Sequence, residues 1–278
     1  MKWKAVALAL LVLGLYWRDL YRLGEDWAVD SNYSHGFLIP VVSAWLVWRS
    51  RDQLRAEKGR PWWPAAVVLV GGLALWVVGA AAAEDLTARV SIVAVLWSIP
   101  ALLGGRTWGK ILSFPALYLL FMIPWPYVLY YRVTFPLQLF STAMATEALR
   151  TLGVHVIRTG NVMTLPNGYQ LEVVAACSGL RSLLSLSALS AIFAYLTQRE
   201  AWRRWFIFLL ALPIAIVGNV VRLVVTALGA YLISVELAEG FLHEVSGLLL
   251  FVVGLGILFL AGGALNWLGK LSRSPQPS

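Results

Sequence analysis

Eight apolar runs alternate with short polar segments along this chain of 278 residues. Most of the runs approach or reach the roughly 20 residues that a helix needs to cross a bilayer, although the first two are short. The pattern predicts an all-α polytopic membrane protein with about eight transmembrane helices. The predicted spans are at about residues 4–17, 33–48, 64–83, 88–104, 111–131, 179–197, 205–233 and 245–268.

The long segment 132–178, between the fifth and sixth runs, has a different pattern. Its first part, 135–153, predicts a short amphipathic helix on the outer membrane surface, which ends at Gly153. The apolar residues at helical spacing in this part are Leu137, Phe140, Met144 and Ala148. The β-prone stretches "VHVIR", "VMTL" and "YQLEVVA" follow, separated by turn residues, and they predict a hairpin or small three-stranded sheet that includes His155.

Composition supports a membrane protein, because 60% of the residues are hydrophobic and only 13% are charged. The single cysteine excludes an intramolecular disulfide, dithiol chemistry and a multi-cysteine zinc site. The basic, apolar N-terminus has no small-residue cleavage site after it, so we interpret it as a retained signal anchor. We expect one integral membrane domain over 1–270 and a disordered cytoplasmic tail over 271–278.

The basic residues are distributed unevenly, which predicts the orientation in the membrane. If the N-terminus is cytoplasmic, the cytoplasmic segments hold 14 of the 22 Lys and Arg residues but only three of the 14 Asp and Glu residues. The positive-inside rule therefore favours cytoplasmic N- and C-termini. The formal net charge of +8 works as an orientation signal, so a nucleic-acid partner is not needed to explain it.

Cys177 lies just before the sixth run, at its outer end, followed by Ser178 and Gly179. A helix N-terminus favours a thiolate, and Arg181, one turn later, acts in the same direction. Free N–H groups at such a helix start can also receive an oxyanion. Taken alone, however, a single cysteine in an apolar chain is more often an inert buried side chain.

Two further polar residues lie at a similar predicted depth. Arg222 follows Arg203 by about 28 Å of helix, which places it near the outer face of the seventh run, three residues after Asn219. It is either a functional group or a snorkelling anchor. His243 begins the eighth run and can carry a proton. Thiol, guanidinium and imidazole together are the parts of a cysteine acyl-transfer site.

Other polar residues have weaker candidate roles. His35 can line the same pocket, and Glu172 either orients His243 or Arg222 or is an exposed strand carboxylate. Ser178, Arg181 and Asn219 are further supporting or substrate-binding candidates. The three histidines lack the spacing of a metal site, so we expect no metal and no cofactor.

At this point the chain resembles the exosortase and archaeosortase family. The resemblance rests on "ACSGLRS" (176–182), "GNVVRL" (218–223) and "FLHEVSG" (241–247), in this order, and on "YSHGFLIP" (33–40). It implies a membrane-embedded cysteine transpeptidase with Cys177 as nucleophile and Arg222 and His243 as its catalytic partners. The implied substrates are exported proteins with a C-terminal sorting signal, made of a Pro-Glu-Pro-like motif, a transmembrane helix and a basic tail.

The same resemblance implies a bacterial inner membrane, an active site that faces the periplasm and a link to exopolysaccharide export. Membrane lipids are the other expected partners, and no oligomeric state is predicted. The alternatives are a transporter with Arg222 and Asn219 along its path, a membrane acyltransferase that uses His243, and a noncatalytic component of an exopolysaccharide export system. A transporter of this kind predicts internal repeats, and none is evident in the sequence.

Overall fold

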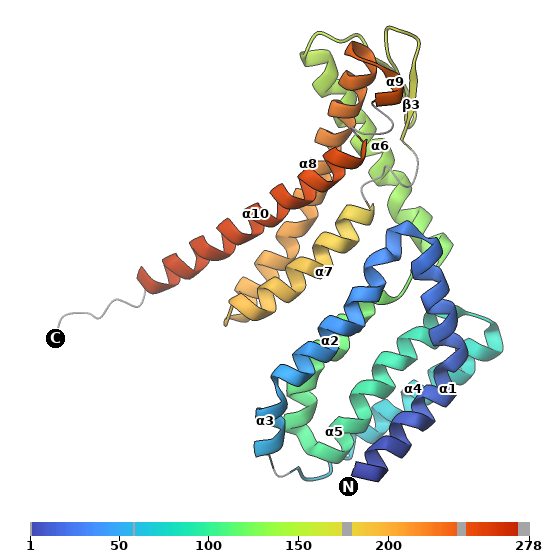
Figure 1. The fold of residues 1–278 in the computed structure, drawn as a ribbon, viewed down its shortest axis with the longest axis vertical. Coiled ribbons are helices and arrows are strands. Elements are labelled where there is room, and N and C mark those ends of the chain that lie inside the picture. The colour runs from blue at the N-terminus through green and yellow to red at the C-terminus, as the bar shows by residue number, and fades with distance from the viewer. Residues whose placement is uncertain (1, 58, 174–179, 238–242, 272–278) are drawn as a thin grey trace, which may run out of the picture. The chain divides into compact units, whose positions relative to one another are not determined.

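The computed structural model describes the whole chain except residues 1, 58, 174–179, 238–242 and 272–278. It is mostly helical and divides into two compact units, Met1–Tyr127 and Val128–Ser278 (Figure 1). The single domain predicted over 1–270 stays a prediction. The tail predicted to be disordered lies, apart from Leu271, outside the described residues.

The first unit is built from helices, and the longest of these helices is bent. Its elements are α1 (Lys2–Val29), η1 (Ser31–Phe37), α2 (Leu38–Arg49), α3 (Arg51–Ala56), α4 (Pro64–Ala82), α5 (Asp85–Tyr118) and η2 (Leu119–Met122). Capping residues explain two of the helix starts. Asp30 accepts a hydrogen bond from the Asn32 amide at 2.8 Å, and Glu84 accepts from the Leu86 and Thr87 amides at 3.0 and 2.7 Å.

α5 consists of two helical arms joined at Gly105, whose φ of 89° and ψ of −178° are not helical. This backbone region is essentially restricted to glycine. A Cβ at Gly105 would also lie 2.7 Å from the Arg60 carbonyl oxygen. Beyond the bend the second arm returns to the first, so that Trp97 Nε1 donates to the Gly109 carbonyl at 2.9 Å. The fourth predicted run and the first part of the fifth therefore lie in one bent element, and the rest of the fifth run continues through η2 (Leu119–Met122) into the next helix.

The second unit begins with α6 (Tyr127–Thr151), which is longer than the helix predicted over 135–153. It ends near Gly153, whose φ is +85°, as the sequence predicted. A meander of three short antiparallel strands follows, in the order β1-β2-β3: β1 (Ile157–Thr159), β2 (Val162–Thr164) and β3 (Gln170–Glu172). The predicted small sheet is confirmed, but its first strand begins only at Ile157, so His155 precedes β1, and it is exposed.

The sheet packs on α6 and α8 (Ala201–Leu232) through one apolar cluster. Met163, Leu171 and Val173 supply the sheet side, and the helix residues of the cluster are Ala145, Leu149, Leu223, Ala227 and Ala230. Three further helices complete this unit: α7 (Leu180–Thr197), α9 (Val235–Leu237) and α10 (His243–Leu271). α7, α8 and α10 pack against one another around a second apolar cluster that includes Leu186, Ile207 and Leu258.

Five helices of the described chain are long and apolar enough to cross a membrane. They are Pro64–Ala82, Asp85–Met122, Leu180–Thr197, Ala201–Leu232 and Val245–Leu268. The second of them contains the bend at Gly105 and holds predicted run 88–104 and residues 111–122 of predicted run 111–131. Runs 4–17 and 33–48 lie in α1 and in η1–α2, which are not among the five. The number of eight spans thus stays a prediction.

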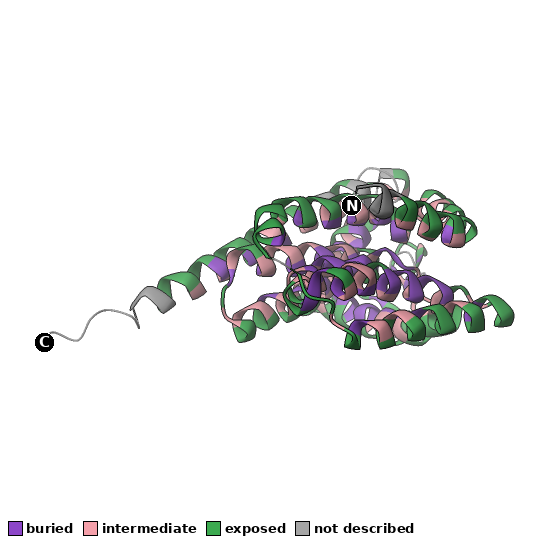
Figure 2. Cartoon of the chain, turned by 90° about the horizontal axis from the view of Figure 1, so that it is seen from below, coloured by how far each residue is buried: buried purple, intermediate pink, exposed green. Residues whose placement is uncertain are grey.

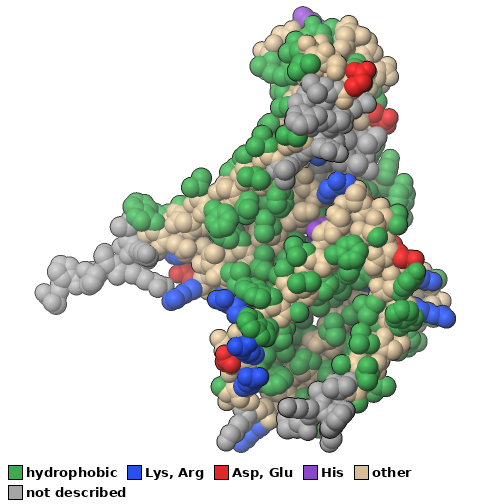
Figure 3. Space-filling view, viewed as in Figure 1, with side chains coloured by type: hydrophobic (Ala, Val, Ile, Leu, Met, Phe, Trp, Pro, Cys, Tyr) green, Lys and Arg blue, Asp and Glu red, His purple; other side chains and the backbone are tan. Residues whose placement is uncertain are grey.

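The surfaces of these helices are what a lipid environment requires. Exposed residues, green in Figure 2, cover long stretches of helix, and many are large and apolar, such as Val67, Leu209 and Leu260. Hydrophobic side chains are spread over the visible face in Figure 3, and several Lys and Arg side chains lie near α3. A helix that is apolar on its outward faces fits hydrocarbon better than water.

Candidate active site

α8 carries a polar face in an otherwise apolar helix. Asn219, Arg222 and Thr226 are three to four residues apart, so they lie on one side of the helix, and all three are buried. Arg222 is only 9% exposed. A charged side chain inside a membrane span costs roughly 2.5–3.5 kcal/mol on insertion scales, so its neighbours must compensate for lost hydration.

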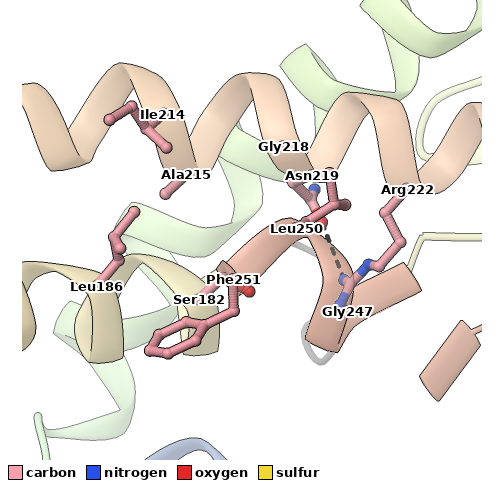
Figure 4. Close-up of a pocket in the computed structure, with 10 residues that line it drawn as sticks. All are labelled: Ser182, Leu186, Ile214, Ala215, Gly218, Asn219, Arg222, Gly247, Leu250 and Phe251. Atoms are coloured by element: carbon pink, nitrogen blue, oxygen red, sulfur yellow. Dashed lines mark hydrogen bonds between the residues drawn. The ribbon is translucent and has the colours of Figure 1, made fainter. Parts of the chain in front are cut away.

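The compensation includes two buried hydrogen bonds in sequence. Arg222 donates from Nη2 to Asn219 Oδ1 at 2.9 Å, and Asn219 donates from Nδ2 to Ser141 Oγ on α6 at 3.3 Å. Figure 4 shows the first of these bonds as a dashed line from Arg222. The guanidinium is thus tied to α8 itself, and the amide that holds it is tied to a second helix.

Next to Arg222 lies a small cavity between α7, α8 and α10 (Figure 4). Its volume of about 20 Å³ is enough for about one water molecule. Most of its lining residues are apolar, and the polar side chains among them are those of Ser182, Asn219 and Arg222. The lining residues are Ser182, Leu186, Ile214, Ala215, Gly218, Asn219, Arg222, Gly247, Leu250 and Phe251.

The three segments that carry the sequence motifs each contribute to this one cavity. Ser182 belongs to "ACSGLRS", Asn219 and Arg222 belong to "GNVVRL", and Gly247 belongs to "FLHEVSG". A Cβ on Gly247 would lie 3.9 Å from Arg222 Nη1, so the backbone of α10 passes close to the guanidinium. Residues up to 65 positions apart in sequence, from Ser182 to Gly247, therefore line one cavity beside Arg222.

The starts of two helices lie beside this cavity. α7 begins at Leu180, two residues before Ser182, and α10 begins at His243, four residues before Gly247. Helix N-termini carry a partial positive charge. Such helix starts and a guanidinium each interact favourably with negative charge, so these groups favour an anion such as a thiolate or an oxyanion.

The structure describes some of the predicted site residues and not others. Cys177 and Ser178 lie outside the described residues, and His243 is the first residue of α10. Asn219 and Arg222 lie together at the cavity. Arg181 is exposed on α7 and does not line the cavity, and Glu172 is exposed at the end of β3.

His35 belongs to the first unit, in η1, outside the five long apolar helices. Its ring stacks on Tyr33 with the ring centroids 6.4 Å apart. Burial lowers the pKa of His35 below its usual range, which favours the neutral imidazole. Within the described residues, no group of three or more His, Cys, Asp or Glu side chains could hold a metal ion.

Sequence reasoning missed the contribution of α6. It emphasised the face of Leu137, Phe140, Met144 and Ala148, but Phe140 and Met144 are 49% and 43% exposed. Another face is buried in protein, and it carries polar residues in addition to Ala145 and Leu149 of the apolar cluster. Its buried polar residues are Thr134, Gln138, Ser141, Thr142 and Thr146. Their recurrence every three to four residues was the available signal that this face contacts other polar groups.

These features define a class of protein: a multi-pass membrane protein with a charged, buried site among its apolar helices. A sequence model described as transmembrane exosortase (Exosortase_EpsH) matches residues 27–260, a range that includes all three motif segments. The chain therefore belongs to the exosortase family. Searches of curated proteins and of solved structures found no match.

Proposed function

We propose that this chain is a membrane-embedded cysteine peptidase or transpeptidase that cleaves the C-terminal sorting signals of exported proteins. One observation supports this most directly: Arg222, Ser182 and Gly247, from the three motif segments, line one cavity. In sequence, Cys177 precedes Ser182 by five positions and His243 precedes Gly247 by four. The proposed nucleophile and proton carrier are therefore close in sequence to residues that line the cavity.

The proposed reaction has two halves. The Cys177 thiolate attacks the scissile carbonyl carbon, and the carbonyl oxygen becomes an oxyanion that Arg222 stabilises. The carbon–nitrogen bond then breaks, His243 gives the departing amine the proton that it took from the Cys177 thiol, and a thioester remains on Cys177. Attack by water on the thioester yields a carboxylic acid, whereas attack by another nucleophile transfers the substrate to that acceptor and regenerates the thiol.

The size of the cavity bears on this proposal. At about 20 Å³ it holds one water-sized atom group but not a peptide. A carbonyl oxygen is close to a water molecule in size, so the oxyanion occupies the cavity while the rest of the substrate lies outside it. The substrate helix, in the lipid phase, brings its motif to the periplasmic face of the inner membrane.

The test is co-expression with an exported protein that carries such a signal, with its C-terminus followed by mass spectrometry. Cys177→Ala should abolish tail removal at an unchanged amount of membrane-inserted enzyme. Cys177→Ser should be nearly inactive as well, because a hydroxyl is a far weaker nucleophile without a stronger base. Full processing by the alanine variant would remove the cysteine mechanism from consideration.

A further inference from the structure

The buried polar face of α6 carries a group that reaches the candidate active site through one intermediate. Ser141, 1% exposed, accepts the hydrogen bond from Asn219 Nδ2, and the amide oxygen of the same Asn219 accepts from Arg222. We propose that Ser141 is a positioning residue for Arg222: it holds the Asn219 amide in the orientation that presents its oxygen to the guanidinium. This proposal rests on the proposed function.

The physical argument starts from the amide. The terminal torsion of an asparagine side chain has a broad, roughly two-fold preference, so its own rotamer does not select between the two orientations. A guanidinium only donates hydrogen bonds. It therefore needs Oδ1 of Asn219, and the reversed amide would place two donors against each other. Arg222, which only donates, selects the end of the amide that carries Oδ1, and the hydroxyl of Ser141 accepts from Nδ2 and so restrains the amide torsion in that orientation.

Burial makes this acceptor consequential. Asn219 is 4% exposed, so bulk solvent does not reach its amide, although the cavity that it lines has room for about one water molecule. Without Ser141 Oγ, the amide samples orientations in which Oδ1 turns away from Arg222. The guanidinium then loses part of its fixed direction toward the cavity. Stabilisation of an oxyanion depends on donors that are held in place before the reaction.

Thr142 provides a matched control on the same helix. It is fully buried, like Ser141, but its hydroxyl donates to the Gln138 carbonyl of its own helix at 2.6 Å. Thr142→Val removes a buried hydroxyl from α6 without touching the Asn219–Arg222 pair. A merely structural need for polar groups on this face would make the two substitutions equivalent.

The experiment measures tail cleavage by purified enzyme in proteoliposomes over a range of substrate concentrations. Ser141→Ala should lower kcat about 3- to 10-fold with KM nearly unchanged, the range expected for one neutral hydrogen bond. Thr142→Val should keep the wild-type kcat. In an Asn219→Ala background, Ser141→Ala should have no further effect, because its action passes through Asn219.

Three results would overturn the inference. The first is an equal kcat for Ser141→Ala and Thr142→Val, and the second is an equal loss of kcat for Ser141→Ala and Ser141→Thr. The third is that Ser141→Ala lowers kcat in the Asn219→Ala background by the same factor as in the wild type. The threonine variant keeps the hydroxyl, so it should retain most of the rate. Ser141→Thr also tests the inference if Ser141→Ala does not accumulate in the membrane. A loss of cleavage rate for Ser141→Thr as large as that for Asn219→Ala would contradict the positioning role of Ser141.

Failure of this inference is distinguishable from failure of the proposed function. If wild-type enzyme cleaves the tail and Cys177→Ala does not, the proposed function stands and the Ser141 series tests only the positioning role. If Cys177→Ala cleaves the tail fully, the proposed function fails first, whatever the Ser141 variants do.

Discussion

At the scale of single residues, Arg222 is the side chain whose position most needs an explanation. It is buried in a helix with membrane-span character, hydrogen-bonded to Asn219, and beside a cavity to which all three motif segments contribute. An arginine that only anchors a helix end would place its head group in the interface. The buried pairing with Asn219 instead supports a functional guanidinium.

Arg222→Lys separates these two roles. Lysine keeps the charge and can snorkel, but it lacks the planar fork of donors that holds both Asn219 and an oxyanion. We expect the variant to insert normally and to lose roughly 10²–10³ in cleavage rate, the usual loss for one oxyanion donor. Cleavage measured at matched enzyme levels for wild type, Arg222→Lys and Arg222→Ala provides the comparison.

The control is Arg199→Lys, at an exposed arginine between α7 and α8, which should leave the rate unchanged. A wild-type rate for Arg222→Lys would exclude Arg222 from the catalytic set. Arg181, the guanidinium nearest to Cys177 in sequence, would then be the next candidate.

At the scale of elements, the bend in α5 shows how one residue shapes a helical unit. Pattern analysis separated runs 88–104 and 111–131, and the structure joins them through Gly105 with its positive φ. The two arms then lie close enough for the Trp97 side chain to donate a hydrogen bond to the Gly109 carbonyl. The geometry of this turn is therefore a requirement for the first unit to assemble.

Gly105→Ala should destabilise the first unit. The backbone conformation costs a non-glycine residue roughly 1–3 kcal/mol, and the new Cβ would lie 2.7 Å from the Arg60 carbonyl oxygen. Thermal unfolding in detergent should show a lower melting temperature. Gly71→Ala, in α4 where a Cβ meets no atom within 4 Å, should leave the melting temperature unchanged or raise it. Equal behaviour of the two variants would contradict this account of the bend.

The face of α6 that is buried in protein was not predicted from the sequence. Sequence periodicity identified a helix and one apolar face correctly, but it did not show which face meets protein. In a membrane the apolar face can point outward to lipid, so the buried face can be the polar one, the reverse of the arrangement in water. Ser141 was missed for this reason.

At the scale of the whole molecule, orientation across the membrane is the testable property. The distribution of Lys and Arg predicts cytoplasmic termini and places Cys177 on the periplasmic side. Because Cys177 is the only cysteine, a thiol reagent reports on it alone.

A membrane-impermeant maleimide applied to intact spheroplasts should therefore label the wild-type protein and not Cys177→Ala. If Cys177 is labelled only when the reagent is given access to the cytoplasmic side, the predicted topology is wrong. The same reagent applied before substrate should also block tail cleavage, which would connect the accessible thiol to the proposed activity.

The sequence by itself determined the class of this protein. Apolar runs of membrane length, the asymmetric basic charge and three motif segments suffice for a helical exosortase-family membrane protein, because hydrophobicity and charge act locally along the chain. The small sheet and the end of α6 at Gly153 were also predictable, since turn residues set them through local backbone preferences.

Only the tertiary structure decided which residues meet. Three features bring together residues from different helices or from the two arms of one helix. They are the cavity shared by Ser182, Arg222 and Gly247, the hydrogen bond between Asn219 and Ser141, and the contact between the two arms of α5. Such contacts depend on how helices rotate and pack around their long axes. In an apolar helix that can expose any face to lipid, hydrophobic periodicity does not specify that rotation.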